Sequence, residues 1–504
     1  MTRARVTLAI LLTITAAAAP IAQPQIDPAA VRSYERARVV LDAAVAAMYG
    51  PSGIDGLQNV AFRYEGDLIH RNQSARTEPP YDRTPTKGYV IFDRAGARLR
   101  IDDAGSFPGG FAWDNRFLLV GRDAANIDLL RKRSSTSTSA TPAPLDPRLR
   151  RLPHAYLAAA LDRARSLRFA GTRDIGGKPH DDITYASPDG RTINLIIDQK
   201  ARTLTRAEWV AADPTAGDTI AADLFPEYQP AGSLLMPLRR IAETAGEATL
   251  DVRHSEFTVN QADAVLAAAF ERPSGFEPLS TDSTAERVTL LAPHVRMIRA
   301  ASGYNTLLVE LADHAVLVEA PSNDDVSGEV LRTAREALPG KPVRFVAATH
   351  HHDDHAGGAR FYMAQGLTFV TTPGNVAYFE HMARRRSTLF GDRPIDKPRI
   401  ETVSGRRSFS DGQTTVELID IGRGPHANEM LIAYVPQAKI VFQGDLLNRP
   451  ADGRVQAGNA TTVHFARRLR ELGIDFERVA GVHGPPASRE EFERIVQMTD
   501  KSSF

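Results

Sequence analysis

The stretch that decides the fold of the C-terminal half of the chain is FVAATHHHDDHAGG, residues 345–358. It begins as an apolar run typical of a buried strand and ends in a glycine pair that leads into a helical pattern. Between them lie four histidines and two aspartates within six residues. Packing imidazoles and carboxylates together without partners costs free energy, so the stretch predicts a bound cation rather than a histidine-rich surface turn.

A specific motif fits this cluster, H-x-H-x-D-H, and its four positions are His350, His352, Asp354 and His355. Three later segments, GPH, QGD and VHG, end or centre on one further polar residue each: His426, Asp445 and His483. On these motifs, and on the apolar strand pattern NTLLVE at residues 305–310, the region from about 288 to 498 resembles the metallo-β-lactamase superfamily. The resemblance implies an αββα sandwich for this region.

The resemblance also implies a ligand set for two metal ions. It assigns three neutral histidines to the first ion: His350, His352 and His426. It assigns a second set to the other ion, Asp354, His355 and His483, with Asp445 bridging the two ions and a hydroxide bridging them on the open side. Asp354 is also the expected catalytic residue, since it would orient that hydroxide. We expect two Zn²⁺, although iron or manganese also suits nitrogen and oxygen ligands.

One position departs from the family pattern. The strand before the metal loop usually ends in aspartate, whereas this chain has Glu319, within the sequence VLVEAP. The family places that carboxylate behind the ligands, so the longer side chain is expected to orient the metal loop or a ligand histidine.

The first half of the chain has a different pattern. A helical apolar spacing covers residues 28–49, and short alternating strands separated by turns follow it. The Ser/Thr run with prolines at residues 131–147 predicts a mobile loop. The order of these elements, and phrases such as TINLIID at residues 192–198, resemble the curved half-barrel of periplasmic lipoprotein-carrier proteins.

Together these patterns predict an α+β chain of two domains. We expect an antiparallel β-rich domain at 23–275, a linker at 276–286 and a metallo-β-lactamase-like domain at 287–504. Residues 1–22 carry a positive start, an apolar run and a small residue before Gln23, which predicts a cleaved export signal. The protein is therefore expected in the periplasm or outside the cell, with no stable membrane insertion after cleavage.

Composition narrows the function. The chain of 504 residues has 61 Lys and Arg against 61 Asp and Glu, which gives no overall charge for binding nucleic acid. It has no cysteine, which excludes disulfides, thiol nucleophiles and a lipid-anchored N-terminal cysteine. The expected partner is a small-molecule substrate, and the oligomeric state stays open.

We therefore expect a zinc-dependent hydrolase that cleaves an ester-like, lactone, thioester or amide bond by attack of the bridging hydroxide. One alternative is a periplasmic protein that binds an apolar ligand or lipid and carries a degenerate hydrolase domain. A second alternative is β-lactamase activity. Fold alone does not choose among these, because this fold carries many chemistries.

Overall fold

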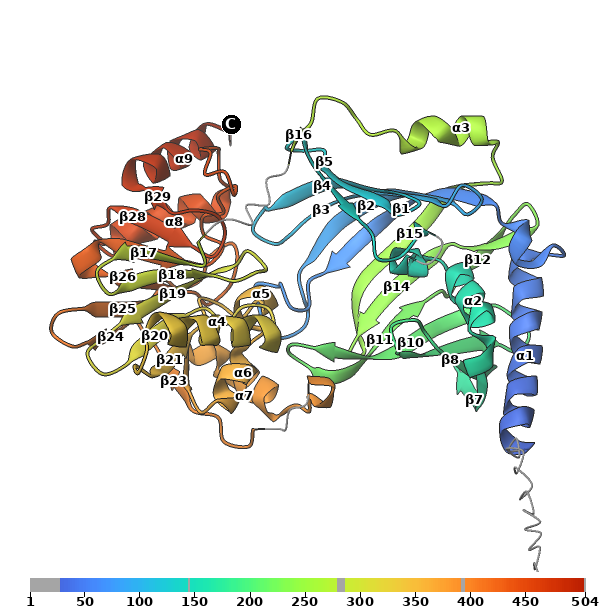
Figure 1. Ribbon diagram of the computed structural model, residues 1–504, viewed down its shortest axis with the longest axis horizontal. Helices are drawn as coiled ribbons and strands as arrows, with labels where there is room; N and C mark the ends of the chain where they lie inside the picture. The colour runs from blue at the N-terminus through green and yellow to red at the C-terminus, as the bar shows by residue number, and fades with distance from the viewer. Residues whose placement is uncertain (1–27, 144–145, 279–285, 391–394, 503–504) are drawn as a thin grey trace, which may run out of the picture.

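The computed structural model describes residues 28–143, 146–278, 286–390 and 395–502. Its elements form two regions with separate sheets, joined by the segment between Pro278 and Val288 (Figure 1). We call residues 28–278 the N-terminal domain and residues 286–502 the C-terminal domain. The expected α+β organisation, with a large antiparallel β-rich region first, is confirmed. The predicted export signal lies outside the described residues, as does most of the predicted linker.

Within the described part of the N-terminal domain, fourteen strands form one long sheet that is antiparallel except at its first pair. In spatial order these strands are β16 (Glu277–Pro278), β6 (Arg133–Thr138), β5 (Asp123–Asp128), β4 (Ala112–Val120), β3 (Arg98–Ser106), β2 (Arg83–Asp93), β1 (Asn59–Ile69), β15 (Glu247–Val259), β14 (Arg239–Thr244), β11 (Gly217–Leu224), β10 (Leu204–Asp213), β9 (Thr192–Asp198), β8 (Lys178–Ala186) and β7 (Arg168–Ile175). A separate hairpin pairs β12 (Tyr228–Ala231) with β13 (Leu234–Pro237).

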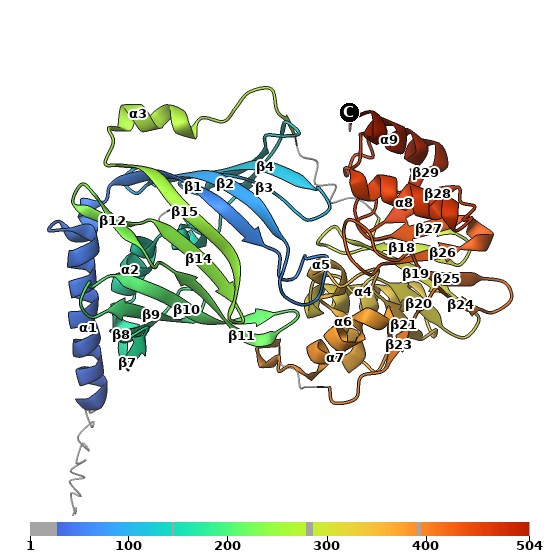
Figure 2. The same cartoon turned by 180° about the vertical axis from the view of Figure 1, so that it is seen from behind.

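The sheet is curved, and two helices, α1 (Pro28–Tyr49) and α2 (Pro153–Asp162), lie next to each other at one side of it (Figures 1 and 2). Helix α1 buries Leu41, Ala44 and Met48, which recur at helical spacing on one face and pack against the strands. Full burial of each large apolar side chain stabilises the fold by about 2 kcal/mol. A third helix, α3 (Asp263–Ala267), packs on the opposite face of the sheet through Leu266.

The C-terminal domain has two sheets packed face to face. In the residues described there, the first sheet runs β17 (Val288–Ala292), β18 (Val295–Arg299), β19 (Asn305–Glu310), β20 (Ala315–Val318), β21 (Val343–Ala347), β22 (Thr368–Thr371) and β23 (Ile400–Thr402). The second runs β24 (Arg406–Ser410), β25 (Thr415–Asp420), β26 (Leu431–Val435), β27 (Ile440–Gln443), β28 (Arg478–Gly481) and β29 (Ala487–Ser488).

Helices cover both outer faces of this pair of sheets. On the first sheet lie α4 (Asp324–Ala337), α6 (Ala359–Ala364) and α7 (Val376–Arg384). On the second lie α8 (Ala460–Glu471) and α9 (Arg489–Ser502). A continuous apolar core between the sheets joins side chains such as Val316 and Phe442, both of which are fully buried. The result is the αββα sandwich that the family resemblance implied.

One expectation about the N-terminal domain was wrong. Residues 133–138, inside the predicted mobile loop at 131–147, form strand β6 and pair with β5 in an antiparallel hairpin. Serine and threonine suit a solvated strand near a sheet edge, where the backbone rather than an apolar face supplies the contacts. Within the described residues, no helix combines the length and the apolarity needed to cross a membrane.

Candidate metal centre

The predicted metal ligands meet where several strands of the C-terminal domain end. Strand β21 leads into residues 350–352 and the short helix α5 (Asp353–Ala356), while Asp445 follows β27 and His483 follows β28. Strands β20 and β21 are parallel, and so are β27 and β28. Because the carboxyl ends of parallel strands share one edge, the segments that follow them converge there.

Local hydrogen bonds fix these segments. Gln443, the last residue of β27, accepts bonds from the N–H groups of Leu446 and Leu447 at 2.7 and 3.0 Å and so folds the turn that carries Asp445. The side chain of Asn305 donates to the carbonyls of Gly481 and Gly484 on either side of His483. The loops are therefore held by buried polar contacts before any ligand is considered.

The structure brings all seven predicted ligands into two overlapping groups. One group is His350, His352, His426 and Asp445; the other is Asp354, His355, Asp445 and His483. In each group the ligand atoms lie within 4.8 Å of one another, and Asp445 belongs to both. This is the arrangement expected for two ions that share one carboxylate.

In the first group three imidazoles face one another, and Asp445 is the carboxylate of that group. His426 Nε2 lies 3.1 Å from His350 Nε2, and the rings of His350 and His352 are 4.4 Å apart. Burial and the neighbouring histidines lower the pKa of His350 and of His352 well below the ordinary value. Both rings are therefore neutral and offer lone pairs rather than protons, as metal binding requires.

The second group contains two carboxylates. His355 Nε2 lies 3.4 Å from a carboxylate oxygen of Asp354 and 3.4 Å from one of Asp445, and His483 Nε2 lies 2.9 Å from Asp445. Burial lowers the pKa of His355, but the carboxylates around it outweigh burial and raise that pKa well above its usual value. A cation is thus the favoured occupant of this position.

The donor set fits a pair of metal ions. His352 Nδ1 and His355 Nε2 are buried and make no hydrogen bond within the described structure, which is costly unless a cation binds them. The ligands are nitrogen and carboxylate oxygen, which suit zinc and also iron or manganese.

Glu319 lies directly behind this cluster. Its side chain is fully buried, and Oε2 lies 3.4 Å from His355 Nδ1, on the side of the ring that faces away from the other ligands. Its backbone φ is 107°, and that of Asp445 is 59°, so both residues adopt left-handed conformations that L-residues rarely occupy. Strain of this kind is concentrated at functional sites.

A family model described as the metallo-beta-lactamase superfamily matches residues 300–480. The C-terminal domain belongs to the metallo-β-lactamase superfamily. The predicted resemblance is therefore confirmed.

Solved metallo-beta-lactamases are also similar to part of the chain. An enzyme from Pontibacter korlensis is 21% identical over 42% of this chain and 98% of its own, with a TM-score of 0.33. FIM-1 from Pseudomonas aeruginosa, solved in a mono-zinc form, is 22% identical over 43% of this chain and 96% of its own, also with a TM-score of 0.33. One from Erythrobacter litoralis is 20% identical, over 42% and 96%, with a TM-score of 0.31. The comparison with curated proteins finds no match.

A cleft of about 650 Å³ opens onto the predicted metal ligands, and both domains line it. The C-terminal domain contributes Tyr304, Asn448 and Arg449 beside the metal ligands, while the N-terminal domain contributes Gln73, Phe107, Phe111 and Arg131. Sequence reasoning missed the N-terminal residues, because they lie on connections between strands and carry no motif.

Several polar residues near the motif have other partners. His351 is buried and packs against Tyr378, and Asp353 accepts a hydrogen bond from Gln73 at 2.6 Å. Arg449 is buried and pairs with Glu491. None of these three belongs to either ligand group.

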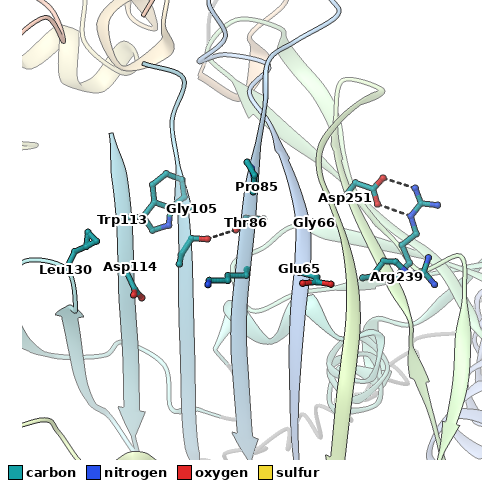
Figure 3. A pocket seen from close by; sticks show the side chains of 13 residues that line it. Glu65, Gly66, Pro85, Thr86, Gly105, Trp113, Asp114, Leu130, Arg239 and Asp251 are labelled. Atoms are coloured by element: carbon teal, nitrogen blue, oxygen red, sulfur yellow. Dashed lines mark hydrogen bonds and ion pairs between the residues drawn. The ribbon is translucent and has the colours of Figure 1, made fainter. Parts of the chain in front are cut away.

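A separate hollow of about 910 Å³ lies over the N-terminal sheet (Figure 3). Its lining mixes charges, and Arg239 and Asp251 pair with each other across neighbouring strands at 2.7 Å. It contains none of the metal ligands, so the cleft between the domains is the candidate active site.

Proposed function

We propose that this protein is an exported hydrolase that holds two zinc ions and cleaves an ester-like, lactone, thioester or amide bond of a small molecule. One observation carries the proposal: seven ligand side chains converge in two groups that share Asp445, at the base of a cleft. The superfamily fold supports a metal-dependent hydrolase in general, and the intact ligand set argues against a degenerate domain.

Two metal ions held by these residues would polarise the scissile carbonyl and lower the pKa of an attacking water. The chain supplies the remaining functions. Asp354 Oδ1 accepts a hydrogen bond from Gln73 at 2.8 Å, while Oδ2 faces His355 and is available to orient a proton of the water. Asn448 Oδ1 is buried without a hydrogen-bond partner in the described structure, so it can accept a bond from an N–H or O–H of the substrate.

The export of the protein is proposed from the apolar N-terminal run, followed by a small residue before Gln23. Apolar-ligand binding inside the curved sheet is the weaker alternative, because α1 and α2 pack against that face through side chains such as Leu41 and Tyr156. β-Lactamase activity would use the same site, so the substrate panel below includes cephalosporins.

The test combines metal analysis with a substrate panel. The purified protein should contain about two metal ions per chain, and the loaded enzyme should hydrolyse at least one member of a panel of esters, lactones, thioesters and cephalosporins. His352→Ala should remove this turnover, while His381→Ala, on a helix outside both ligand groups, should retain it. A folded wild-type protein that binds no metal would refute the proposal.

A further inference from the structure

The connection between β1 and β2 of the N-terminal domain reaches across to the metal ligands of the C-terminal domain. Both ribbon views place this blue connection against α5 (Figures 1 and 2). The carbonyl of Asn72 accepts a hydrogen bond from the N–H of Asp353 at 3.3 Å, and that of Ala75 accepts one from Asn428 at 2.8 Å. Residues 72–75, here called the metal-facing loop, are thus attached by their backbone to both segments that flank the cluster.

The amide of Gln73 binds a metal ligand directly. Gln73 Nε2 donates to Asp354 Oδ1 at 2.8 Å and to Asp353 Oδ1 at 2.6 Å. The other oxygen of Asp354 then faces the cluster, 3.4 Å from His355 Nε2 and 3.9 Å from His483 Nε2. Hydrogen bonds to ionised groups are the stronger ones, so this amide restrains the rotation of the carboxylate.

The backbone of Ser74 acts on a ligand of the other group. His352 Nε2 donates to the carbonyl of Ser74 at 2.9 Å, and both groups are buried. With its proton on Nε2, the ring leaves the Nδ1 lone pair free, and Nδ1 has no hydrogen-bond partner in the described structure. A carbonyl that accepts the N–H of a ligand histidine, on the ring nitrogen that does not bind the metal, fixes both the tautomer and the orientation of the ring.

We propose that the metal-facing loop is a working part of the metal centre, with Gln73 as a positioning residue for Asp354 and the Ser74 carbonyl as a positioning group for His352. The inference rests on the proposed metal centre. It gives the N-terminal domain a defined role, which is to orient one ligand in each of the two groups.

Gln73→Leu in the full-length chain tests this, because it removes the amide and keeps an apolar side chain that is one atom shorter. We expect a 10- to 100-fold loss of affinity for the second zinc ion, measured by competition with a chromogenic chelator. Gln73→Glu should weaken binding further, because it places a carboxylate against Asp354. The matched control is Gln199→Leu, which removes a similar amide bond to Asp181 at 2.9 Å elsewhere in the N-terminal domain.

The outcomes separate the two proposals. If wild-type protein binds no metal, the proposed function itself fails. If wild-type and Gln73→Leu proteins bind both ions with equal affinity, or if Gln199→Leu weakens binding as much, the positioning role of Gln73 is wrong. Far-ultraviolet circular dichroism and thermal unfolding of each variant verify the fold. If Gln73→Leu is unstable, the zinc affinity of Gln73→Glu is measured in its place.

A second inference comes from the turn between β3 and β4, residues 107–111, here called the aromatic turn. The turn lies over a metal ligand: the Gly109 carbonyl accepts a hydrogen bond from Thr461, and a β-carbon at Gly109 would meet His426 Nδ1 at 3.0 Å. Gly109 has φ +91°, so a residue without a side chain suits both its conformation and this close approach.

Two phenylalanines of the aromatic turn line the cleft and remain partly exposed, Phe107 at 36% and Phe111 at 39%. Trp113 packs on Phe107 with ring centroids 4.9 Å apart, and the Arg131 guanidinium lies 5.1 Å from the Phe111 ring. Exposed aromatic rings beside a catalytic cleft favour a ligand that covers them. We infer that the substrate carries a flat apolar group next to the scissile bond, and that the aromatic turn binds it.

Binding of two small carboxylates to the metal-loaded protein tests this inference. Phenylacetate should bind about tenfold more tightly than acetate, since its phenyl ring would contact the two phenylalanine rings of the aromatic turn. Phe107→Ala combined with Phe111→Ala should remove that difference and leave acetate unchanged, whereas Leu290→Ala, at an exposed site outside the cleft, should preserve it. Equal affinity of the wild-type protein for the two acids would overturn this inference and leave the metal proposal standing.

Discussion

Replacing Glu319 by glutamine should weaken the binding of the second metal ion and leave the binding of the first unchanged. The side chain is buried behind His355, its Oε2 lies 3.4 Å from His355 Nδ1, and His355 belongs only to the group formed with Asp354, Asp445 and His483. Glutamine keeps the shape of the side chain and removes its negative charge. The change therefore tests the electrostatic role of this carboxylate without creating a cavity.

The size of the expected loss of affinity depends on whether His355 is charged or neutral. Two unit charges 3.4 Å apart would attract by about 5 kcal/mol at an effective dielectric constant of about 20, which is an upper bound. A metal-bound histidine is neutral, so Glu319 meets only its N–H dipole, and hydrogen bonds to charged groups contribute about 1.5 to 3 kcal/mol. Because 3.4 Å is long for such a bond, we expect the lower end, about 1.5 kcal/mol, or roughly a tenfold loss of affinity.

Stepwise zinc titration against a chelator measures the two affinities separately. Glu310→Gln is the matched control, since Glu310 is also ion-paired but contacts Lys341 and Arg296 away from the cluster. Glu319→Asp, one methylene shorter, should fall between wild type and Glu319→Gln. Glu319 has no selective role at the second ion if Glu319→Gln binds that ion as tightly as wild type, or if the affinities for both ions fall equally.

Three further outcomes follow from the structure. Burial lowers the pKa of His154 to about 4, below its unfolded value near 6.5, so stability present above pH 6.5 should fall by about 3 kcal/mol as pH drops toward 4. His154→Gln should reduce this loss in thermal unfolding measured across pH. Phe369→Ala empties a fully buried site and should cost about 3 to 5 kcal/mol in urea unfolding, against about 0.5 kcal/mol or less for exposed Leu290→Ala. Chelation should lower the Tm of the wild-type protein reversibly, and it should lower the Tm of His352→Ala less.

The metal cluster could be predicted from the sequence because its ligands sit in short segments with strong local patterns. The run at 345–358 specifies a buried strand, a ligand loop and a helix start within fourteen residues, and the structure forms β21 and α5 there. The ends of apolar strands also marked two of the later candidate ligands, since Asp445 and His483 each follow a short apolar strand. Alternation and helical spacing similarly predicted α1 and most strands of the N-terminal sheet.

The serine and threonine run at β6 shows where such patterns fail. Its composition is that of a loop. It forms a strand because its backbone pairs with β5, and this pairing depends on the neighbouring strand and not on the segment itself. A sequence pattern reports what a segment can bury by itself. It carries little information about strands held mainly by backbone pairing with a partner.

The metal-facing loop could not be predicted from the sequence. Gln73 and Asp354 are 281 positions apart, and nothing in the residues around Gln73 marks them as part of a metal site. The ligand atoms are chosen by metal chemistry, which restricts them to a few residue types, whereas an amide or a backbone carbonyl behind them can come from any segment that folding brings close. In this protein the motif therefore predicts which atoms could bind metal, whereas the hydrogen bonds that hold Asp354 and His352 come from a loop of the other domain.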